Sequence, residues 1–404
     1  MVEIKVLYVA EGVGQPTNGA MMSGSELLAS YPNDKVSVSV LTDTKVKKYY
    51  KKLFPHVKHF FSIPKSKIHL PIFGNMIYSF FVERRIQDLL RIYHFNIVHV
   101  NARVSFMPIP TASKTPTVFY LMNNPWCFYV NRFGPLQNTI LESLFSFFWF
   151  FKTIRLIKKT SSYYFLESRQ IADQLINLGV PSDHILLNSI GIIFQRTASN
   201  INNSDMKEQK LLRSLSILGK DHFLLLFVGR LCYAKNIHLL TKALQILNAH
   251  QRKIKLVLIG DAKDFLSRYY FRKLFKSFER TFKENILWIG EIKNRKLLKE
   301  IYHLVDIVII PSLTEAGPRV FVEAISLEKH VLSTPVGLPH QFLDKKYLIS
   351  PDNPNHLASR LLKILKEGTT QLNYRVPKIK TKFSSWNEIA LRLADFYQAI
   401  LDQS

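Results

Sequence analysis

Short apolar runs alternate with helical patterns along most of this sequence, and this alternation restricts the fold more than any other feature. In the first half, the helical patterns include YSFFVERRIQDLLRIY and SRQIADQLINLG. The runs that we predict to be strands are IKVLYVA, VSVSVLTD, NIVHV, TVFYLM, SYYFLES and HILLNSI. Such alternation is typical of a parallel sheet that is covered by helices on both faces.

The alternation restarts after a polar stretch from Ala198 to Lys220, which we interpret as a connection. The later segments are FLLLFVG, NIHLLTKALQILNAH, IKLVLIG, one long basic helix, NILWIG, NRKLLKEIYHL, DIVIIPS, RVFVEAISL and SSWNEIALRLADFYQAIL. A chain of 404 residues has two domains by default. We therefore predict an α/β protein with two Rossmann-like domains, residues 1–197 and residues 217–383, and a final helix over residues 384–404. Two such domains that face a cleft place the carboxyl ends of their strands, and hence their binding loops, on both sides of it.

The two cysteines, Cys127 and Cys232, lie far apart in the sequence. This argues against a disulfide framework and suits a reducing compartment. The apolar part of MVEIKVLYVAEG is too short for a secretory signal. The apolar segment from Ile140 to Ile154 is shorter than the roughly 20 residues that span a bilayer. We expect a cytoplasmic protein that is soluble or associates with a membrane at its periphery.

The formal net charge of +25 is spread unevenly, because no acid occurs between Thr44 and Val82. Aromatic residues alternate there with eight lysines: Lys45, Lys47, Lys48, Lys51, Lys52, Lys58, Lys65 and Lys67. A second segment, Leu144 to Lys159, joins an aromatic run to a basic one. Three interpretations stay open: a solvated surface with some core aromatics, a surface that binds an anionic membrane, or one that binds nucleic acid. The aromatic content suits a lipid interface at least as well as a nucleic acid.

The stretch FVGRLCYAKN places Gly229 and Arg230 at a strand end and Lys235 just before a helix. Two cations beside the amides and the positive dipole end of a helix N-terminus make a good diphosphate site. The alternative is a surface loop with ordinary basic residues.

The stretch PSLTEAGPRVFVEA carries two carboxylates, Glu315 and Glu323. Gly317 and Pro318 break the chain, so that a helix with unpaired amides begins near Arg319. Glu315 then lies in the loop before the helix, and Glu323 lies about one turn inside it. A carboxylate can accept two hydrogen bonds from a vicinal diol such as that of a ribose. The alternative is two acids on a solvated face.

Together, these motifs resemble those of the retaining glycosyltransferases of group 1, or family 4, which have the GT-B fold of two Rossmann-like domains. Glu315 and Glu323 match the E-x7-E pair of that family, and Arg230 and Lys235 match its Gly-Arg-Leu-x3-Lys element. The segments LGVPSDHILLNSIGI and FSSWNEIALRLADFY are similar to the end of its first sheet and to its terminal helix, which crosses back to the first domain.

The resemblance implies that the second domain binds a nucleotide-sugar donor and that the first domain binds most of the acceptor. Glu323 would then bind the ribose, Glu315 the hydroxyls of the transferred sugar, and Arg230 with Lys235 the departing diphosphate. The backbone near Ile292 would border the base. The remaining donor-binding positions would be Gly229, Gly317, Pro318 and Arg319. The sequence contains no Asp-x-Asp, so we expect neither a bridging metal nor another cofactor.

The chain departs from the family pattern at two places that would bind the acceptor or the sugar. The first loop keeps only Gly19 where the family often has a Gly-Gly pair. Asn123 and Asn124 stand where many members carry His-Asp, and asparagine can bind a sugar hydroxyl but cannot titrate.

These features predict a metal-independent, retaining transferase of the hexosyltransferase type that acts on an acceptor hydroxyl. A lipid-linked or membrane-adjacent glycan would be the acceptor, at an anionic membrane surface. The alternatives are a nucleotide-sugar epimerase of similar architecture and a catalytically inactive basic protein that binds a membrane or nucleic acid.

Overall fold

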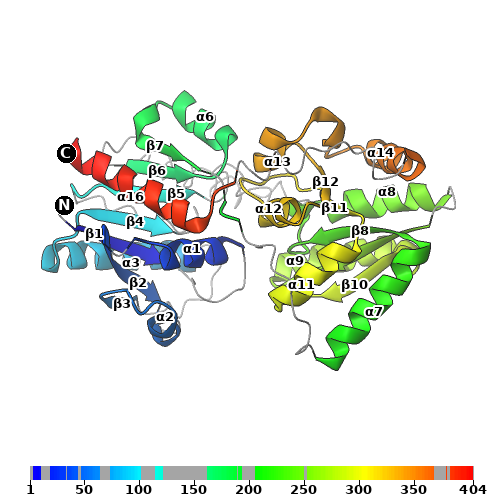
Figure 1. Ribbon diagram of the computed structural model, residues 1–404, viewed down its shortest axis with the longest axis horizontal. Coiled ribbons are helices and arrows are strands. Elements are labelled where there is room, and N and C mark those ends of the chain that lie inside the picture. Colours follow the sequence, from blue (N-terminus) through cyan, green and yellow to red (C-terminus); the bar gives the residue numbers. More distant parts are fainter. Residues whose placement is uncertain are drawn as a thin grey trace. The chain divides into compact units, whose positions relative to one another are not determined.

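The computed structural model describes residues 3–10, 19–32, 34–43, 47–63, 73–101, 114–121, 162–188, 190–192, 205–249, 253–367, 379 and 383–403. The chain divides into two compact units. The described residues up to Gly191 form the first unit together with those from Ser384 onward, and the described residues between Ile192 and Phe383 form the second. Each unit is built on one parallel sheet (Figure 1).

The sheet of the first unit has seven strands in the order β3-β2-β1-β4-β5-β6-β7. The central strands are apolar on both faces, as expected for a parallel sheet that helices cover on both sides. The strands are β1 (Ile4–Ala10), β2 (Val36–Asp43), β3 (Phe60–Ile63), β4 (Ile97–Asn101), β5 (Thr117–Leu121), β6 (Ser162–Leu166) and β7 (Ile185–Leu187).

The described helices of the first unit include one that comes from the end of the chain. They are α1 (Gly19–Ala29), α2 (Lys47–Leu53), α3 (Phe73–Ile92), α6 (Arg169–Asn177), the 3-10 helix η4 (Ser182–His184) and α16 (Trp386–Asp402). A capping box starts α16, since the Ser385 hydroxyl accepts a hydrogen bond from the Glu388 amide and the Glu388 side chain accepts one from the Ser385 amide.

The final helix α16 packs against α1 of the first unit (Figure 1, red). Its Tyr397 hydroxyl lies 2.7 Å from the Tyr31 hydroxyl and 2.6 Å from His99 Nδ1, and all three side chains are buried. Burial lowers the pKa of His99 to about 3, so the ring is neutral and Tyr397 is bonded to an uncharged partner. The chain therefore returns to the first unit after it has formed the second.

The sheet of the second unit has five strands in the order β10-β9-β8-β11-β12. The strands are β8 (Phe223–Val228), β9 (Ile254–Ile259), β10 (Ile286–Gly290), β11 (Ile307–Ile310) and β12 (His330–Ser333). The helices are α7 (Met206–Asp221), η5 (Tyr233–Lys235), α8 (Ile237–Ala249), α9 (Phe265–Ser277), α10 (Glu279–Asn285), α11 (Arg295–Leu304), α12 (Arg319–Ser326), α13 (Gly337–Phe342), η6 (Lys345–Tyr347) and α14 (Pro354–Glu367).

The strand order of this sheet reverses between β8 and β11, which are hydrogen-bonded neighbours. In open α/β sheets, ligands bind beyond the carboxyl ends of the strands at such a reversal. The loops that leave β8 and β11 carry Arg230 with Lys235 and Glu315, so both sequence motifs lie at the expected place.

The two Rossmann-like sheets and the return of α16 confirm the predicted fold class. Three local features differ from the sequence-based expectations. The single long basic helix is divided into α9 and α10, because the backbone of Phe278 leaves the helical conformation (ψ 31°). Helix α7 occupies most of the polar stretch that we interpreted as a connection. Strands β3 and β12 were not among the predicted strands, and each has only four residues.

Candidate functional site

Three glycines bring the ends of β8, β9 and β10 close together. The Gly229 amide donates to the Ile259 carbonyl at 3.0 Å, and the Gly260 amide donates to the Gly290 carbonyl at 2.8 Å. The φ of Gly260 is +143°, and a Cβ atom there would lie 1.8 Å from the Gly229 carbonyl oxygen. Only glycine fits at Gly260, so these strand ends can approach one another.

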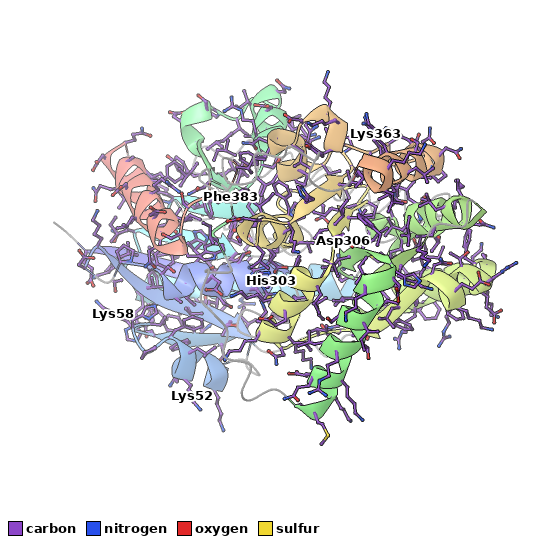
Figure 2. The ribbon with its side chains drawn as sticks, turned by 45° about the vertical axis from the view of Figure 1, so that its right-hand side comes forward. Lys52, Lys58, His303, Asp306, Lys363 and Phe383 are labelled. Carbon is purple, nitrogen blue, oxygen red and sulfur yellow. The ribbon has the colours of Figure 1, made fainter. Side chains whose placement is uncertain are left out.

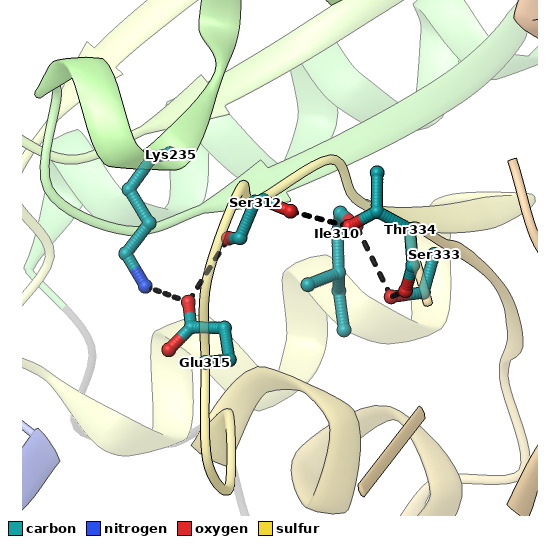
Figure 3. Close-up of polar contacts among 6 residues, drawn as sticks. All are labelled: Lys235, Ile310, Ser312, Glu315, Ser333 and Thr334. Carbon is teal, nitrogen blue, oxygen red and sulfur yellow. Dashed lines mark hydrogen bonds and ion pairs between the residues drawn. The ribbon is translucent and has the colours of Figure 1, made fainter. Parts of the chain in front are cut away.

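Lys235 and Glu315 meet at this edge of the second sheet (Figure 3). Lys235 ends the 3-10 helix η5, and its ammonium group forms an ion pair with Glu315 Oε1. The Ser312 hydroxyl donates to the same oxygen at 2.9 Å. The side chains of Lys235 and Glu315 are 21% and 10% exposed, so the pair is partly shielded from water but open on one side.

The backbone around Lys235 is fixed by its neighbours. Asn236 adopts the left-handed conformation (φ 53°, ψ 41°) and is buried, and its side-chain amide donates to the Pro351 carbonyl at 2.7 Å. The Leu313 amide donates to the Ala234 carbonyl at 2.8 Å, which joins the Glu315 loop to η5. These contacts hold the loops of both charged residues against each other.

The Glu315 loop is also supported from the side of β12. The Thr334 hydroxyl donates to the Ser312 carbonyl, and the Ser333 hydroxyl donates to the Ile310 carbonyl at 3.1 Å (Figure 3). Gly337 has a φ of +48°, and a Cβ atom there would lie 1.8 Å from the Ala316 carbonyl oxygen. The loop is thus packed on both sides, which fixes the carboxylate of Glu315.

Glu323 belongs to a separate buried network. Its side chain projects from α12 and is 4% exposed. Arg295 Nη2 donates to one carboxylate oxygen at 2.7 Å, and the Tyr302 hydroxyl donates to the other at 2.8 Å. Burial and the charge of Glu323 raise the pKa of Tyr302 well above its usual value, so the phenol keeps its proton and remains a donor. Glu323 is therefore paired on both oxygens and fixed in orientation.

Sequence reasoning did not find Arg295 and Tyr302. Both lie on α11, seven residues apart and hence on the same face of the helix. The available signal was that a carboxylate inside an apolar helix such as α12 must be paired when it is buried. The pattern NRKLLKEIYHL contains the two partners, but nothing local indicates which of its polar residues turn inward.

Arg230 is exposed and does not join the Lys235–Glu315 pair. It lies close enough to Asp264, the N-cap of α9, to affect that carboxylate. Partial burial raises the pKa of Asp264, but hydrogen bonds from the Ser267 hydroxyl and amide, together with the Arg230 cation, hold the pKa below its usual value. Arg230 therefore faces the start of α9.

The other expected site residues have these positions. Pro318 is the N-cap of α12, with Gly317 before it and buried Arg319 as its first helical residue. Ile292 is half-buried just after β10. Gly19 is the first residue of α1, whereas Asn123 and Asn124 lie outside the described residues. A Cβ atom on Gly229 would lie 3.9 Å from Lys235 Cε, so the Lys235 side chain passes over this glycine.

Comparison with known proteins identifies residues 209–379 as a match to the family model "Glycosyl transferases group 1". An uncharacterised glycosyltransferase, MJ1607 of Methanocaldococcus jannaschii, is 26% identical over 210 residues, which cover 50% of this chain and 51% of that protein. The phosphatidylinositol N-acetylglucosaminyltransferase gpi3 subunit of Schizosaccharomyces pombe is 25% identical over 195 residues, 46% of this chain and 40% of that protein. The matches thus span about half the length of these relatives or less.

The fold is similar to that of solved structures over almost the whole chain. Anabaena Alr3699/HepE in complex with UDP-glucose superposes with a TM-score of 0.63 at 18% identity, covering 99% of both chains. At this identity the likeness concerns the fold alone.

Proposed function

Because residues 209–379 match the family model of the group 1 glycosyltransferases, we propose that this protein transfers a sugar from a nucleotide-sugar donor to an acceptor hydroxyl. The observation that carries the proposal is the Lys235–Glu315 ion pair at the carboxyl ends of β8 and β11. It places a cation that can bind a diphosphate beside a carboxylate that can accept hydrogen bonds from sugar hydroxyls. The UDP-glucose bound to the Anabaena protein supports a donor of this chemical class.

Lys235 and Arg230 would stabilise the negative charge that develops on the diphosphate as the sugar leaves. A lysine ammonium group has three N–H donors, so Lys235 can bind a phosphate oxygen and keep Glu315 in place. The N-terminus of α12 would add the positive end of a helix dipole. Glu315, oriented by the Ser312 hydroxyl, would then accept hydrogen bonds from the transferred sugar.

Glu323 would bind the ribose of the donor. Each of its oxygens holds one partner, Arg295 or Tyr302, and a carboxylate has about four acceptor positions. Since Glu323 is 4% exposed and the Arg295 side chain is 34% exposed, a ribose would approach past Arg295. The backbone at Ile292 would border the base, as in the sequence-based expectation.

We assign the reaction to the retaining class of hexosyl transfer. The acceptor hydroxyl would attack the anomeric carbon on the face from which the diphosphate departs, and a phosphate oxygen of the donor would take the acceptor proton. On that route the protein supplies no base. Its residues hold the sugar, the diphosphate and the acceptor in the geometry that the transfer needs.

An acceptor at an anionic membrane is the finer part of the proposal. Lys48, Lys51 and Lys52 of α2 are exposed, and Figure 2 shows the side chain of Lys52 extending away from the first unit. Phe80 and Phe81 of α3 are 61% and 47% exposed. In the described part of the chain, no helix has the length and apolarity needed to cross a bilayer. The name of the fission-yeast relative, a phosphatidylinositol sugar transferase, also supports a lipid-linked acceptor.

A panel of nucleoside diphosphates and nucleotide sugars tests the proposal. The matching ligand at 100 times its dissociation constant should add about 2.7 kcal/mol to the free energy of unfolding of the second unit. The Glu315→Gln variant should still bind the nucleoside diphosphate. Its turnover of the nucleotide sugar, measured as diphosphate formed per unit time, should be far slower. Failure of every member of the panel to bind, or full turnover by Glu315→Gln, would contradict the assignment.

A further inference from the structure

Helix α9 of the second unit has two opposite faces. The buried face consists of Ser267, Phe271 and Leu274, which are spaced by four and three residues and pack toward the sheet. The opposite stripe consists of Phe265, Tyr269, Arg272 and Lys276, which are spaced by four, three and four residues, and all four are exposed. These spacings put each set on one side of a helix.

The exposed side of α9 is basic. The helix has four cations and no acid, and the cations are Arg268, Arg272, Lys273 and Lys276. All four are exposed, and none of them forms an ion pair within the described parts of the chain.

Asp261 and Asp264, just before α9, accept hydrogen bonds from the Ala262 amide and from Ser267, and the next acids along the chain are paired with cations outside α9. In α10, Glu279 pairs with Lys283, and Glu284 pairs with Arg280. Beyond β10, Glu291 pairs with Lys263. These ion pairs neutralise the neighbouring carboxylates, so the four cations of α9 keep a net positive charge on this face.

Apolar and aromatic surface accompanies this charge. Phe265 is 76% exposed and Tyr269 is 51% exposed. On β10, which is an edge strand of the sheet, Leu287 and Trp288 are 37% and 46% exposed. The Trp288 ring contacts Phe271 on the buried face of α9, with 4.9 Å between ring centroids, so β10 supports the helix from its inner side.

We propose that the outer face of α9 docks on an anionic lipid bilayer. Arginine and lysine side chains would contact the headgroup phosphates, while Phe265 and Tyr269 would enter the boundary between headgroups and acyl chains. Phe265 and Tyr269 share one stripe with Arg272 and Lys276, so the rings can enter the headgroup boundary while the cations contact the phosphates, which is the arrangement that a lipid surface uses.

Docking through α9 would bring the donor site to the membrane. The N-cap of the helix is Asp264, whose carboxylate lies near Arg230, so the first turn of α9 adjoins the proposed diphosphate site. This consequence for catalysis rests on the proposed function, whereas the docking itself does not. Docking through α9 is also independent of the lysines of α2, which belong to the first unit.

The test measures partition of the full-length protein onto vesicles. Vesicles of phosphatidylcholine alone are compared with vesicles that contain phosphatidylglycerol. The Arg272→Glu/Lys276→Glu variant should bind the anionic vesicles about tenfold less tightly or worse. The matched control is Lys210→Glu/Arg213→Glu on α7, whose charges are also exposed in the second unit, and it should change binding by less than about twofold.

A Phe265→Trp variant reports where the helix lies. Its emission should shift to shorter wavelength, and brominated lipid should quench it, on anionic vesicles only. Equal partition of the α9 and α7 variants, or an unshifted emission, would overturn the proposal. A single-stranded oligonucleotide that shifts the emission when vesicles do not would identify nucleic acid as the partner instead.

Calorimetry with nucleoside diphosphates on the same variants separates the two proposals. Loss of vesicle binding in the α9 variant, with nucleotide affinity unchanged, supports docking through this face. Vesicle binding through α9 by a protein that binds no nucleotide would leave the docking in place and remove the glycosyltransferase assignment.

Discussion

Lys235 and Glu315 are 80 residues apart in the sequence and form an ion pair at the carboxyl ends of two neighbouring strands. The pair joins the motif that we predicted to bind a diphosphate to the motif that we predicted to bind a sugar. Because the Leu313 amide also bonds to the Ala234 carbonyl, the two motifs are fixed relative to each other before any ligand arrives. The proposed site is therefore preorganised on the side of the second unit.

Replacement of Lys235 by alanine should weaken binding of the nucleoside diphosphate. A hydrogen bond to a charged group contributes about 1.5–3 kcal/mol, so the dissociation constant should rise by about tenfold to hundredfold. Calorimetry measures the effect, and Lys242→Ala is the matched control, since Lys242 is an exposed lysine on α8. If the two variants bind equally well, Lys235 does not contact the diphosphate.

Replacement of Arg295 by alanine should destabilise the second unit, because it leaves the buried Glu323 carboxylate without its cation. Arg295 is partly exposed, so we expect a loss of about 1–3 kcal/mol in the free energy of unfolding. Urea denaturation measures this loss. The double variant Arg295→Ala/Glu323→Gln should recover part of it, whereas additive losses would show that the two residues are not coupled.

Gly260→Ala should be more damaging than Gly290→Ala. Both glycines have positive φ, but an added Cβ would lie 1.8 Å from the Gly229 carbonyl oxygen at Gly260 and would meet nothing within 4 Å at Gly290. Gly290→Ala should therefore cost about 1–2 kcal/mol from backbone strain alone. Gly260→Ala should cost more and also weaken nucleotide binding, because it pushes apart the ends of β8 and β9. Thermal denaturation and calorimetry on both variants decide this, and equal losses would refute the steric argument.

Stability of the first unit should depend on pH through His99. Burial lowers its pKa to about 3 in the folded protein, whereas an unfolded histidine titrates near 6.5. Between these two pKa values the unfolded state binds more protons than the folded state. The free energy of unfolding therefore has its full value above about pH 6.5 and decreases as the pH falls below that. The slope approaches about 1.4 kcal/mol per pH unit.

Hydrogen exchange of the α16 amides measures this dependence, since Tyr397 of α16 contacts His99. The variant His99→Phe should lower stability at pH 7 by loss of the bond to Tyr397, yet it should flatten the profile between pH 6.5 and pH 4. His238 of the second unit has a pKa lowered by burial to about 4. It therefore also makes the free energy of unfolding decrease as the pH falls from 6.5 to 4. If the pH dependence of exchange in α16 is the same in His99→Phe as in the unaltered protein, groups other than His99 cause it.

The sequence predicted those strands and loops that a pattern within one short segment determines. Strand β8 is an unbroken apolar run, β1 is apolar except for Lys5, and the loop after β11 follows directly from its Gly-Pro break. The division of the basic helix at Phe278 could not be predicted, since no glycine or proline marks it.

The partners within the site depend on tertiary packing. Glu323 was recognised from its spacing to Glu315, but its bonds to Arg295 and Tyr302 require a particular rotation of α11 against α12. Its role in ribose binding stays a prediction, as do the roles of Glu315, Arg230 and Lys235.

The position of α16 has a consequence for how the protein is made. Ribosomes synthesise the strands of the first unit before the second unit, yet Tyr397, the partner of Tyr31 and His99, follows the second unit in the sequence. Until then, the first unit lacks the helix that covers part of its core, while the second unit has all of its elements and can fold as they emerge. A nascent chain would thus hold a finished second unit beside an unfinished first one. Chaperones that bind exposed apolar surface would therefore meet the first unit until α16 has been synthesised.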